Sequence, residues 1–535
     1  MAKRDNELQD SAAGKMDRRG FFRGGAAMLG AWSAVGLLRP AAEPAFAAET
    51  AQSMATNETL SAQTQRALRW AGTMPADWVR PRGNADHNVV IVGGGQTGIS
   101  IAYGLRRKGI GKVIVIEQAD QGKAGIWRDI ARMQQLRTPK TLIGPEQGNA
   151  PLGFRAWFET LNTPGAFDAL DRIPRLAWAD YLTWFENISA AQTQYRTRLT
   201  DIEPAGDVLR LHMTVDGMPR TVTTRKLVFA NGYNGSGGAS VPGFIRALPQ
   251  EKWSHTEKPI NFASLKGKVV GVLGAGASAF DAAGTALEQG AAEVHLFSRR
   301  AYIGYTNAPQ GGQVASPPPR PADQGFSNMI EWAYALPDPV RWRSQIARER
   351  SVATVPYDSM MRAVNHDNFR LHIDAPWDKV AVANGKIAVT SRGKTYRFDY
   401  VISGTGYQID LAAQPEFANI HPMIALWRDR YQPDMDEADK ASGAYPYLGA
   451  GFQFLAREEK DAATLRNIHC ANLGASASFN ILVGDVPSMV LQPQLVASIA
   501  RDFMVDGVDL AVNKRSLAAP ATAPDPAPYQ KAIRS

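Results

Sequence analysis

Three observations predict an α/β fold with two Rossmann-like dinucleotide-binding domains, the second inserted into the first. A pattern of apolar strand, glycine-rich turn, helix and second strand begins near Asn88 and recurs from Lys268, and this alternation is typical of doubly wound domains. The 535 residues exceed what one hydrophobic core usually organises. Apolar residues make up 44% and charged residues 21%, which is the balance of a globular protein with a large core.

The first unit carries every part of a dinucleotide site. An apolar strand over 89–92 runs into a glycine turn, a helix is predicted over 99–108, and a second strand over 112–116 ends at a carboxylate. In such turns the glycines permit a tight bend, admit pyrophosphate to the backbone and let the helix pack on the strand, while the acid accepts hydrogen bonds from ribose hydroxyls. The predicted cofactor contacts here are Gly93, Gly95, Gly98, Glu117 and Gln118.

The second unit repeats the pattern with one difference in charge. Its strands are predicted over 269–273 and 293–297 and its helix over 280–289, but two arginines follow where the first unit has an acid. Arginines can donate bidentate hydrogen bonds to a ribose 2′-phosphate, so the unit favours NADPH over NADH. The alternative is that the arginines solvate a surface loop. The predicted contacts are Gly274, Gly276, Ser278, Ala279, Arg299 and Arg300.

The N-terminus predicts export. Arg18 and Arg19 precede two phenylalanines, a weakly apolar stretch over 24–38 and small residues ending at Ala47, a pattern that resembles a twin-arginine signal peptide cleaved after Ala47. The alternative is an amphipathic N-terminal helix. The prediction implies the twin-arginine export machinery as a partner and a periplasmic enzyme, with no integral membrane span after cleavage.

The predicted boundaries follow these signals. We expect a signal peptide over 1–47, a packing arm over 48–88, a first dinucleotide-binding domain formed by 89–260 and 400–512, a second over 261–399, and a disordered tail rich in alanine and proline over 513–535.

Composition excludes several other classes. A net charge of +8 is too mild for nucleic-acid binding. Cys470 is the only cysteine, so the chain can form no internal disulfide, thiolate zinc cage or CxxC redox pair, and we expect a small buried hydrophobe at this position. The spacing of the cluster His366, Asp367, His372 and Asp374 fits no ligand motif, so no metal site is predicted.

Further segments resemble the flavin monooxygenases that bind two dinucleotides, namely the flavin-containing monooxygenases, the Baeyer–Villiger monooxygenases and the lysine and ornithine N-hydroxylases. The likeness covers about residues 88–490. Around His255 the fingerprint of the first two groups is broken, because Pro249 and Glu251 stand where Phe and Gly belong. The segments that carry the resemblance are Gly125–Arg128, Ile173–Arg175, Tyr181–Trp184, Phe229–Gly232, Asp399–Tyr407, with Gly404 where alanine is usual, and Gly484–Asp485.

The resemblance implies FAD and NADPH as cofactors, and a single-component monooxygenase that transfers one atom of molecular oxygen to the nitrogen, sulfur or carbonyl group of a small substrate. It adds Trp127, Thr405, Gly406 and Asp485 as cofactor contacts, and it suggests that Arg137 and Thr138 lie beside the isoalloxazine as catalytic residues. An exported flavin oxidase or dehydrogenase, which would not depend on scarce periplasmic NADPH, and a non-catalytic flavin electron-transfer protein remain open, as does a homodimer.

Overall fold

The computed structural model describes residues 59–60, 62–70, 74–306, 329–351, 354–509, 513–514 and 525–534. The predicted signal peptide over 1–47 lies outside these residues, as do part of the arm and about half of the tail. In the part of the chain that is described, no helix is both long and apolar enough to cross a membrane.

The first sheet has seven strands in the order β3-β2-β1-β6-β5-β4, with β19 also paired to β6. Its centre is parallel, because Val90 on β1 pairs with both Ile114 on β2 and Leu227 on β6. β1 is fully buried over Val89–Ile91, as expected for a strand covered on both faces. The strands are β1 (His87–Val92), β2 (Val113–Ile116), β3 (Thr193–Gln194), β4 (Thr197–Ala205), β5 (Val208–Val215), β6 (Met218–Phe229) and β19 (Ile468–Cys470).

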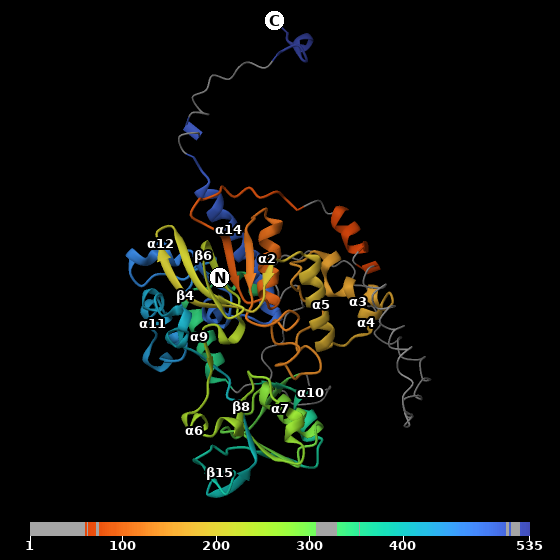
Figure 1. The fold of residues 1–535 in the computed structure, drawn as a ribbon, viewed down its shortest axis with the longest axis vertical. Coiled ribbons are helices and arrows are strands. Elements are labelled where there is room, and N and C mark those ends of the chain that lie inside the picture. The colour runs from red at the N-terminus through yellow and green to blue at the C-terminus, as the bar shows by residue number, and fades with distance from the viewer. Residues whose placement is uncertain are drawn as a thin grey trace, which may run out of the picture. The chain divides into compact units, whose positions relative to one another are not determined.

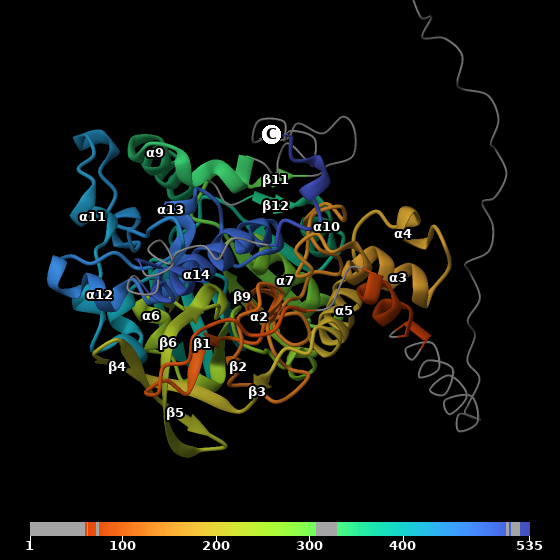
Figure 2. The same cartoon turned by 90° about the horizontal axis from the view of Figure 1, so that it is seen from above.

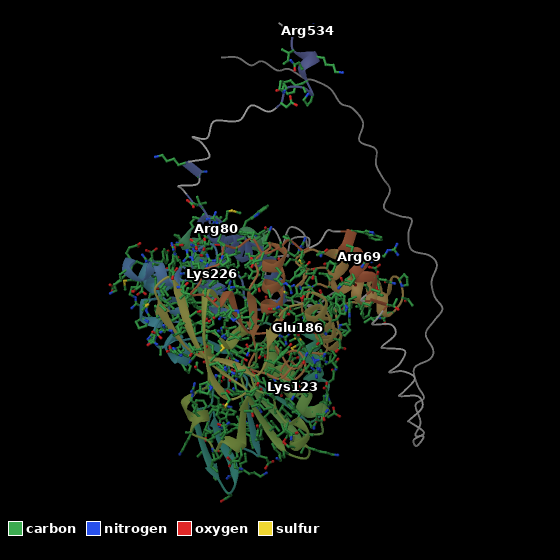
Figure 3. The ribbon with its side chains drawn as sticks, turned by 45° about the horizontal axis from the view of Figure 1, so that its top comes forward. Arg69, Arg80, Lys123, Glu186, Lys226 and Arg534 are labelled. Carbon is green, nitrogen blue, oxygen red and sulfur yellow. The ribbon has the colours of Figure 1, made fainter. Side chains whose placement is uncertain are left out.

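Two helices that are far apart in the sequence pack against each other beside this sheet. α2 (Gln96–Arg107) follows the first glycine turn, and α14 (Gln492–Asp506) packs against it (Figure 1). The ammonium of Lys226, labelled in Figure 3, lies 2.6 Å from the Asp502 carboxylate of α14 and is almost fully buried. This ion pair anchors the C-terminal helix to the centre of the sheet.

The second sheet is parallel, in the order β13-β10-β9-β17-β8. α7 (Ala277–Glu288) follows its glycine turn, and α10 (Tyr357–Val364) packs on α7. An antiparallel sheet of β14, β15 and β16 extends from it. The strands are β8 (Trp253–His255), β9 (Val269–Leu273), β10 (Glu293–Phe297), β13 (Phe369–His372), β14 (Lys379–Ala383), β15 (Lys386–Ser391), β16 (Lys394–Phe398) and β17 (Tyr400–Ser403). The predicted α/β class with two Rossmann-like sheets is confirmed.

The sheets do not follow the predicted boundaries at 260/261 and 399/400. Val401 on β17 pairs with both Gly271 on β9 and Trp253 on β8, so both outer segments belong to the second sheet. Pairing between strands far apart in sequence decides where a domain begins, and residue composition carries no signal for it.

One helix within 261–399 crosses to the first unit. α9 (Asp338–Arg350) packs against α13 (Ser476–Phe479), and the Arg341 guanidinium donates to the Ser478 carbonyl at 2.9 Å. The Trp342 and Trp427 rings lie 6.0 Å apart. Figures 1 and 2 both show α9 beside α11, and Figure 1 shows it away from β15. The chain then returns to the second unit, where β12 (Thr354–Pro356) pairs with β11 (Gly304–Thr306).

A helical layer covers one side of the first unit in both Figure 1 and Figure 2. It has its own aromatic core, in which Phe154, Trp157, Trp178 and Tyr181 are buried. The layer consists of α3 (Phe154–Leu161), α4 (Ala166–Ala169) and α5 (Arg175–Ile188). Further short elements are β7 (Gly237–Ala239), β18 (Tyr407–Ile409), α6 (Gly243–Arg246), α11 (Trp427–Arg430) and α12 (Ala462–Leu465).

Candidate functional site

A cavity of about 1690 Å³ lies between the two glycine turns. Gly93 and Glu117 line it from the first unit, and Ser278 and Asp281 line it from the second. Pockets for one small ligand usually hold about 300–1,000 Å³, so this cavity has room for more than one ligand. Of the predicted residues, it is lined by Gly93, Gly95, Glu117, Gln118, Trp127, Arg137, Thr138, Ser278 and Asp485.

The first glycine turn has the geometry that a dinucleotide needs. A Cβ on Gly98 would lie 1.9 Å from the Gly93 carbonyl oxygen, so Gly98 is required for the close approach of α2 to the turn. Gly95 is the N-cap of α2 and lines the cavity. Helix N-termini carry partial positive charge and free N–H groups, which favour phosphate. The chain thus presents an anion site where the pyrophosphate was predicted.

Glu117 is held in place by the backbone around it. Its Oε2 accepts the Gly94 N–H at 2.7 Å, and its Oε1 accepts the Ala119 N–H at 2.8 Å. The side chain is buried at the end of β2 and lines the cavity. These bonds orient the carboxylate, and each oxygen has a second lone pair that can accept a ribose hydroxyl. The residues present therefore fit FAD at the first turn.

A loop from the C-terminal part of the chain closes the first site. Asp485 lines the cavity and is the N-cap of a 3-10 helix, where it accepts the Ser488 N–H at 3.4 Å. Gln96, at the start of α2, donates to the Gly484 carbonyl at 3.4 Å and accepts from the Trp178 indole at 3.1 Å. The loop that sequence motifs suggested is thus placed beside the first glycine turn.

The second glycine turn differs from the first in the position of one methyl group. A Cβ on Gly404 would lie 2.6 Å from the Cβ of Ala279. The second turn has Ala279 where the first has Gly98, and Gly404 stands where the motif that this segment resembles usually has alanine. The small residue at 404 therefore accommodates the methyl of Ala279. Gly274, whose Cβ would lie 2.3 Å from the Gly404 carbonyl oxygen, completes this contact.

Gly404→Ala is expected to destabilise the protein by about 1–3 kcal/mol, because the added methyl overpacks the contact with Ala279. Ala279→Gly should rescue it in the double variant, which restores one methyl between the two positions. Thermal unfolding of the four proteins checks this. A double variant as unstable as Gly404→Ala alone would contradict the contact.

The two predicted arginines differ in their surroundings. Arg299 is exposed just after β10. Arg300 donates from both Nη atoms to the Arg350 carbonyl at the end of α9, each at 3.2 Å. Arg299 is thus the exposed residue of the pair, and its contact with a 2′-phosphate stays a prediction, while Arg300 ties the second unit to the crossing helix.

Several of the predicted cofactor contacts do not line the cavity. Gly98, Gly274, Gly276 and Ala279 belong to the turns themselves, and the Thr405 hydroxyl donates to the Ser240 carbonyl. Gly406 has φ +79 and its carbonyl accepts the Ser240 N–H at 2.9 Å. None of these lines the described cavity, and neither do Arg299 and Arg300.

Arg137, predicted beside the flavin, also reaches the second unit. Its guanidinium forms an ion pair with Asp281 on α7. Asp281 was missed by sequence reasoning, although a carboxylate among the alanines of a buried helix was a signal. Tyr233 and Tyr407 were not predicted as site residues either; their rings lie 5.3 Å apart, edge to face, and both line the cavity.

Two other predictions concern residues outside the site. Burial raises the pKa of the Cys470 thiol to about 12, so it stays protonated and inert, as a buried hydrophobe would. In the part of the chain that the structure describes, no cluster of His, Cys, Asp or Glu could hold a metal ion. His372 instead stacks on His295, with ring nitrogens 2.9 Å apart.

Comparisons with known proteins agree with this geometry. Residues 90–314 match the family described as pyridine nucleotide-disulphide oxidoreductase. The FAD-dependent urate hydroxylase of Xanthomonas campestris is 37% identical over 436 residues, which cover 80% of this chain and 89% of that protein. A single cysteine leaves no dithiol for disulphide chemistry within the chain.

Two solved structures share the fold. The ornithine hydroxylase of Pseudomonas aeruginosa has a TM-score of 0.59 at 15% identity and covers 78% of this chain and 99% of its own. The L-lysine 6-monooxygenase of Pseudomonas syringae has a TM-score of 0.59 at 18% identity, covering 79% and 100%. At these identities the likeness concerns the fold alone.

Proposed function

The chain belongs to the family of the Xanthomonas FAD-dependent urate hydroxylase and is a flavin-dependent oxidoreductase, and from this we propose that it is an NADPH-using monooxygenase of a small planar heterocycle. The observation that carries the proposal is one cavity that is lined both by the first glycine turn and by Ser278 of the second. Bound FAD would accept a hydride from NADPH and transfer one atom of O₂ to the substrate, the other leaving as water.

The chain's own residues would bind and orient the two cofactors and the substrate. The first turn and Glu117 would hold FAD, and the second turn, with Ser278, would hold the nicotinamide nucleotide. Burial raises the pKa of Tyr407 to about 12, so its hydroxyl remains a hydrogen-bond donor at neutral pH. The rings of Trp127, Tyr233 and Tyr407 offer faces and edges to a flat aromatic substrate. A heterocycle of the urate type fits this lining and the family.

The proposal is tested by anaerobic bleaching of bound FAD with NADPH and, separately, with NADH. We expect faster bleaching by NADPH, followed by urate-dependent consumption of O₂. Arg299→Ala should weaken NADPH binding by about tenfold, the loss of one charge-assisted phosphate contact, and leave NADH binding unchanged. Arg397→Ala, an exposed arginine on β16 that does not line the cavity, is the control for a general loss of positive charge.

Bound FAD that neither nucleotide reduces would contradict the monooxygenase and favour an oxidase, a dehydrogenase or an electron-transfer protein. If Arg299→Ala binds NADPH as tightly as the wild type does, the Arg299 guanidinium makes no contact with the 2′-phosphate. Export through the twin-arginine machinery, a periplasmic location and a homodimer stay predictions.

A further inference from the structure

Asp281 is a buried carboxylate at the junction of the two units. Its side chain is only 3% exposed on α7, one turn beyond Ser278 at the N-terminus of that helix. A carboxylate removed from water to this degree is stable only with charged partners. Both partners are arginines, and they come from different units.

The first partner, Arg137, lies in the loop that follows the first dinucleotide unit. It pairs with Oδ2 of Asp281 across the cavity, and its own side chain is 31% exposed. The second, Arg362, lies on α10 of the second unit, with Nη1 3.6 Å from Oδ1 of Asp281. Asp281 thus pairs both with Arg362 of its own unit and with Arg137 of the other unit.

Three further hydrogen bonds cross at the same place. Arg132 donates to the carbonyls of Thr256 at 2.7 Å and Lys258 at 2.6 Å, next to β8. Arg362 donates to the Arg132 carbonyl at 2.7 Å, while its Nε and Nη2 hold Glu288 at 2.9 and 2.7 Å. Residues 132–137 of the first unit are therefore bound to the second unit by hydrogen bonds and an ion pair. The Arg137–Asp281 ion pair is the part of this contact in which both side chains line the cavity.

Resting on the proposed function, we propose that Asp281 is a positioning residue that acts through Arg137 to fix the distance between the nucleotide on the second turn and the flavin on the first. Hydride transfer moves one hydrogen with two electrons from the nicotinamide to the flavin and requires the donor and acceptor within a narrow range of separation. A misplacement of about 1 Å can slow a reaction by about 100-fold. The pair spans the cavity between the two turns, where such a constraint acts most directly.

Asp281→Asn tests this with little risk to folding. It removes the buried charge, and Arg137 can turn to solvent. Arg137→Gln removes the same pair from the other side but leaves a buried carboxylate facing Arg362 alone, so a larger loss of stability is expected. Asp374→Asn is the matched control, because Asp374 is an exposed partner of Arg392 within the second unit.

The first readout is the spacing of the units in the FAD-loaded enzyme without nucleotide. Spin labels can be placed at Met218→Cys on the first sheet and Ala381→Cys on β14, both exposed, because the native Cys470 is fully buried. We expect one narrow distance in the wild-type background and in Asp374→Asn, and a broadened distribution in Asp281→Asn and Arg137→Gln.

The second readout is the rate of flavin reduction per bound FAD. With NADPH we expect a loss of about 10- to 100-fold in Asp281→Asn, with unchanged reduction by dithionite and unchanged FAD content. The double variant with Arg137→Gln should be no slower than the slower single variant. A purely structural role would lower FAD content and thermal stability without changing the rate per bound flavin.

Wild-type spacing or a wild-type reduction rate in Asp281→Asn would overturn the inference while leaving the proposed function intact. If no nicotinamide nucleotide reduces the FAD of the wild-type protein, the proposed function is overturned instead. The distance between the labels would still decide whether Asp281 fixes the spacing of the two units.

Discussion

Gly98→Ala is expected to remove most of the folded, FAD-binding protein. The new methyl would lie 1.9 Å from the Gly93 carbonyl oxygen, which is a backbone atom held by the sheet and cannot turn aside. Either α2 moves off the strand or the turn opens, and the N-terminus of α2 then no longer faces the phosphates. We expect destabilisation of more than about 4 kcal/mol. Soluble yield, thermal unfolding of the apoprotein and FAD content measure the effect.

Gly95→Ala separates this packing role from cofactor binding. The nearest atom to a Cβ on Gly95 is the Gly125 Cα at 3.6 Å, an ordinary contact, and Gly95 has φ −73, which alanine adopts. The methyl would stand in the cavity where the pyrophosphate is expected. The apoprotein should therefore unfold as the wild type does, with FAD bound more weakly. If FAD binding is unchanged as well, its phosphates do not approach this turn.

These glycine turns were predictable because all of their determinants are contiguous in sequence. The strands expected over 269–273 and 293–297 coincide with β9 and β10. The helices expected from residues 99 and 280 begin at 96 and 277 instead. In each case the glycine before the helix is its N-cap, so the helix begins directly after the turn. The error is confined to one turn of helix.

The contacts between the units could not be predicted in this way. Arg137 and Asp281 are 144 positions apart, and neither has a local motif that names the other. α9 has the composition of an ordinary surface helix, yet its partners lie around Trp427 and Ser478. Such contacts depend on how whole sheets are placed, and this information is spread over the tertiary structure.

Acidification from pH 7 to pH 4 is expected to destabilise the protein strongly through two buried histidines. Burial lowers the pKa of His255 to about 4 and that of His469 to about 3, whereas an unfolded chain titrates both near about 6.5. Because the folded-state values are the lower ones, the unfolded state binds more protons below about pH 6.5. The stability is therefore complete above that pH and is lost as the pH falls, by an amount of order 3 kcal/mol for each histidine at about pH 4.

The local contacts explain why neither ring accepts a second proton readily. Nδ1 of His469 donates to the Gly451 carbonyl at 2.8 Å, and its Nε2 is buried without a hydrogen-bond partner, near the positive charge of Lys226. Nδ1 of His255 accepts the Glu257 N–H at 3.1 Å. His469→Gln and His255→Gln should each flatten the dependence of the urea unfolding midpoint on pH between 4 and 6.5. His212→Gln, at a half-exposed position on β5, should leave it as steep as in the wild type. An acid response as steep in both buried-site variants would show that other groups drive the unfolding.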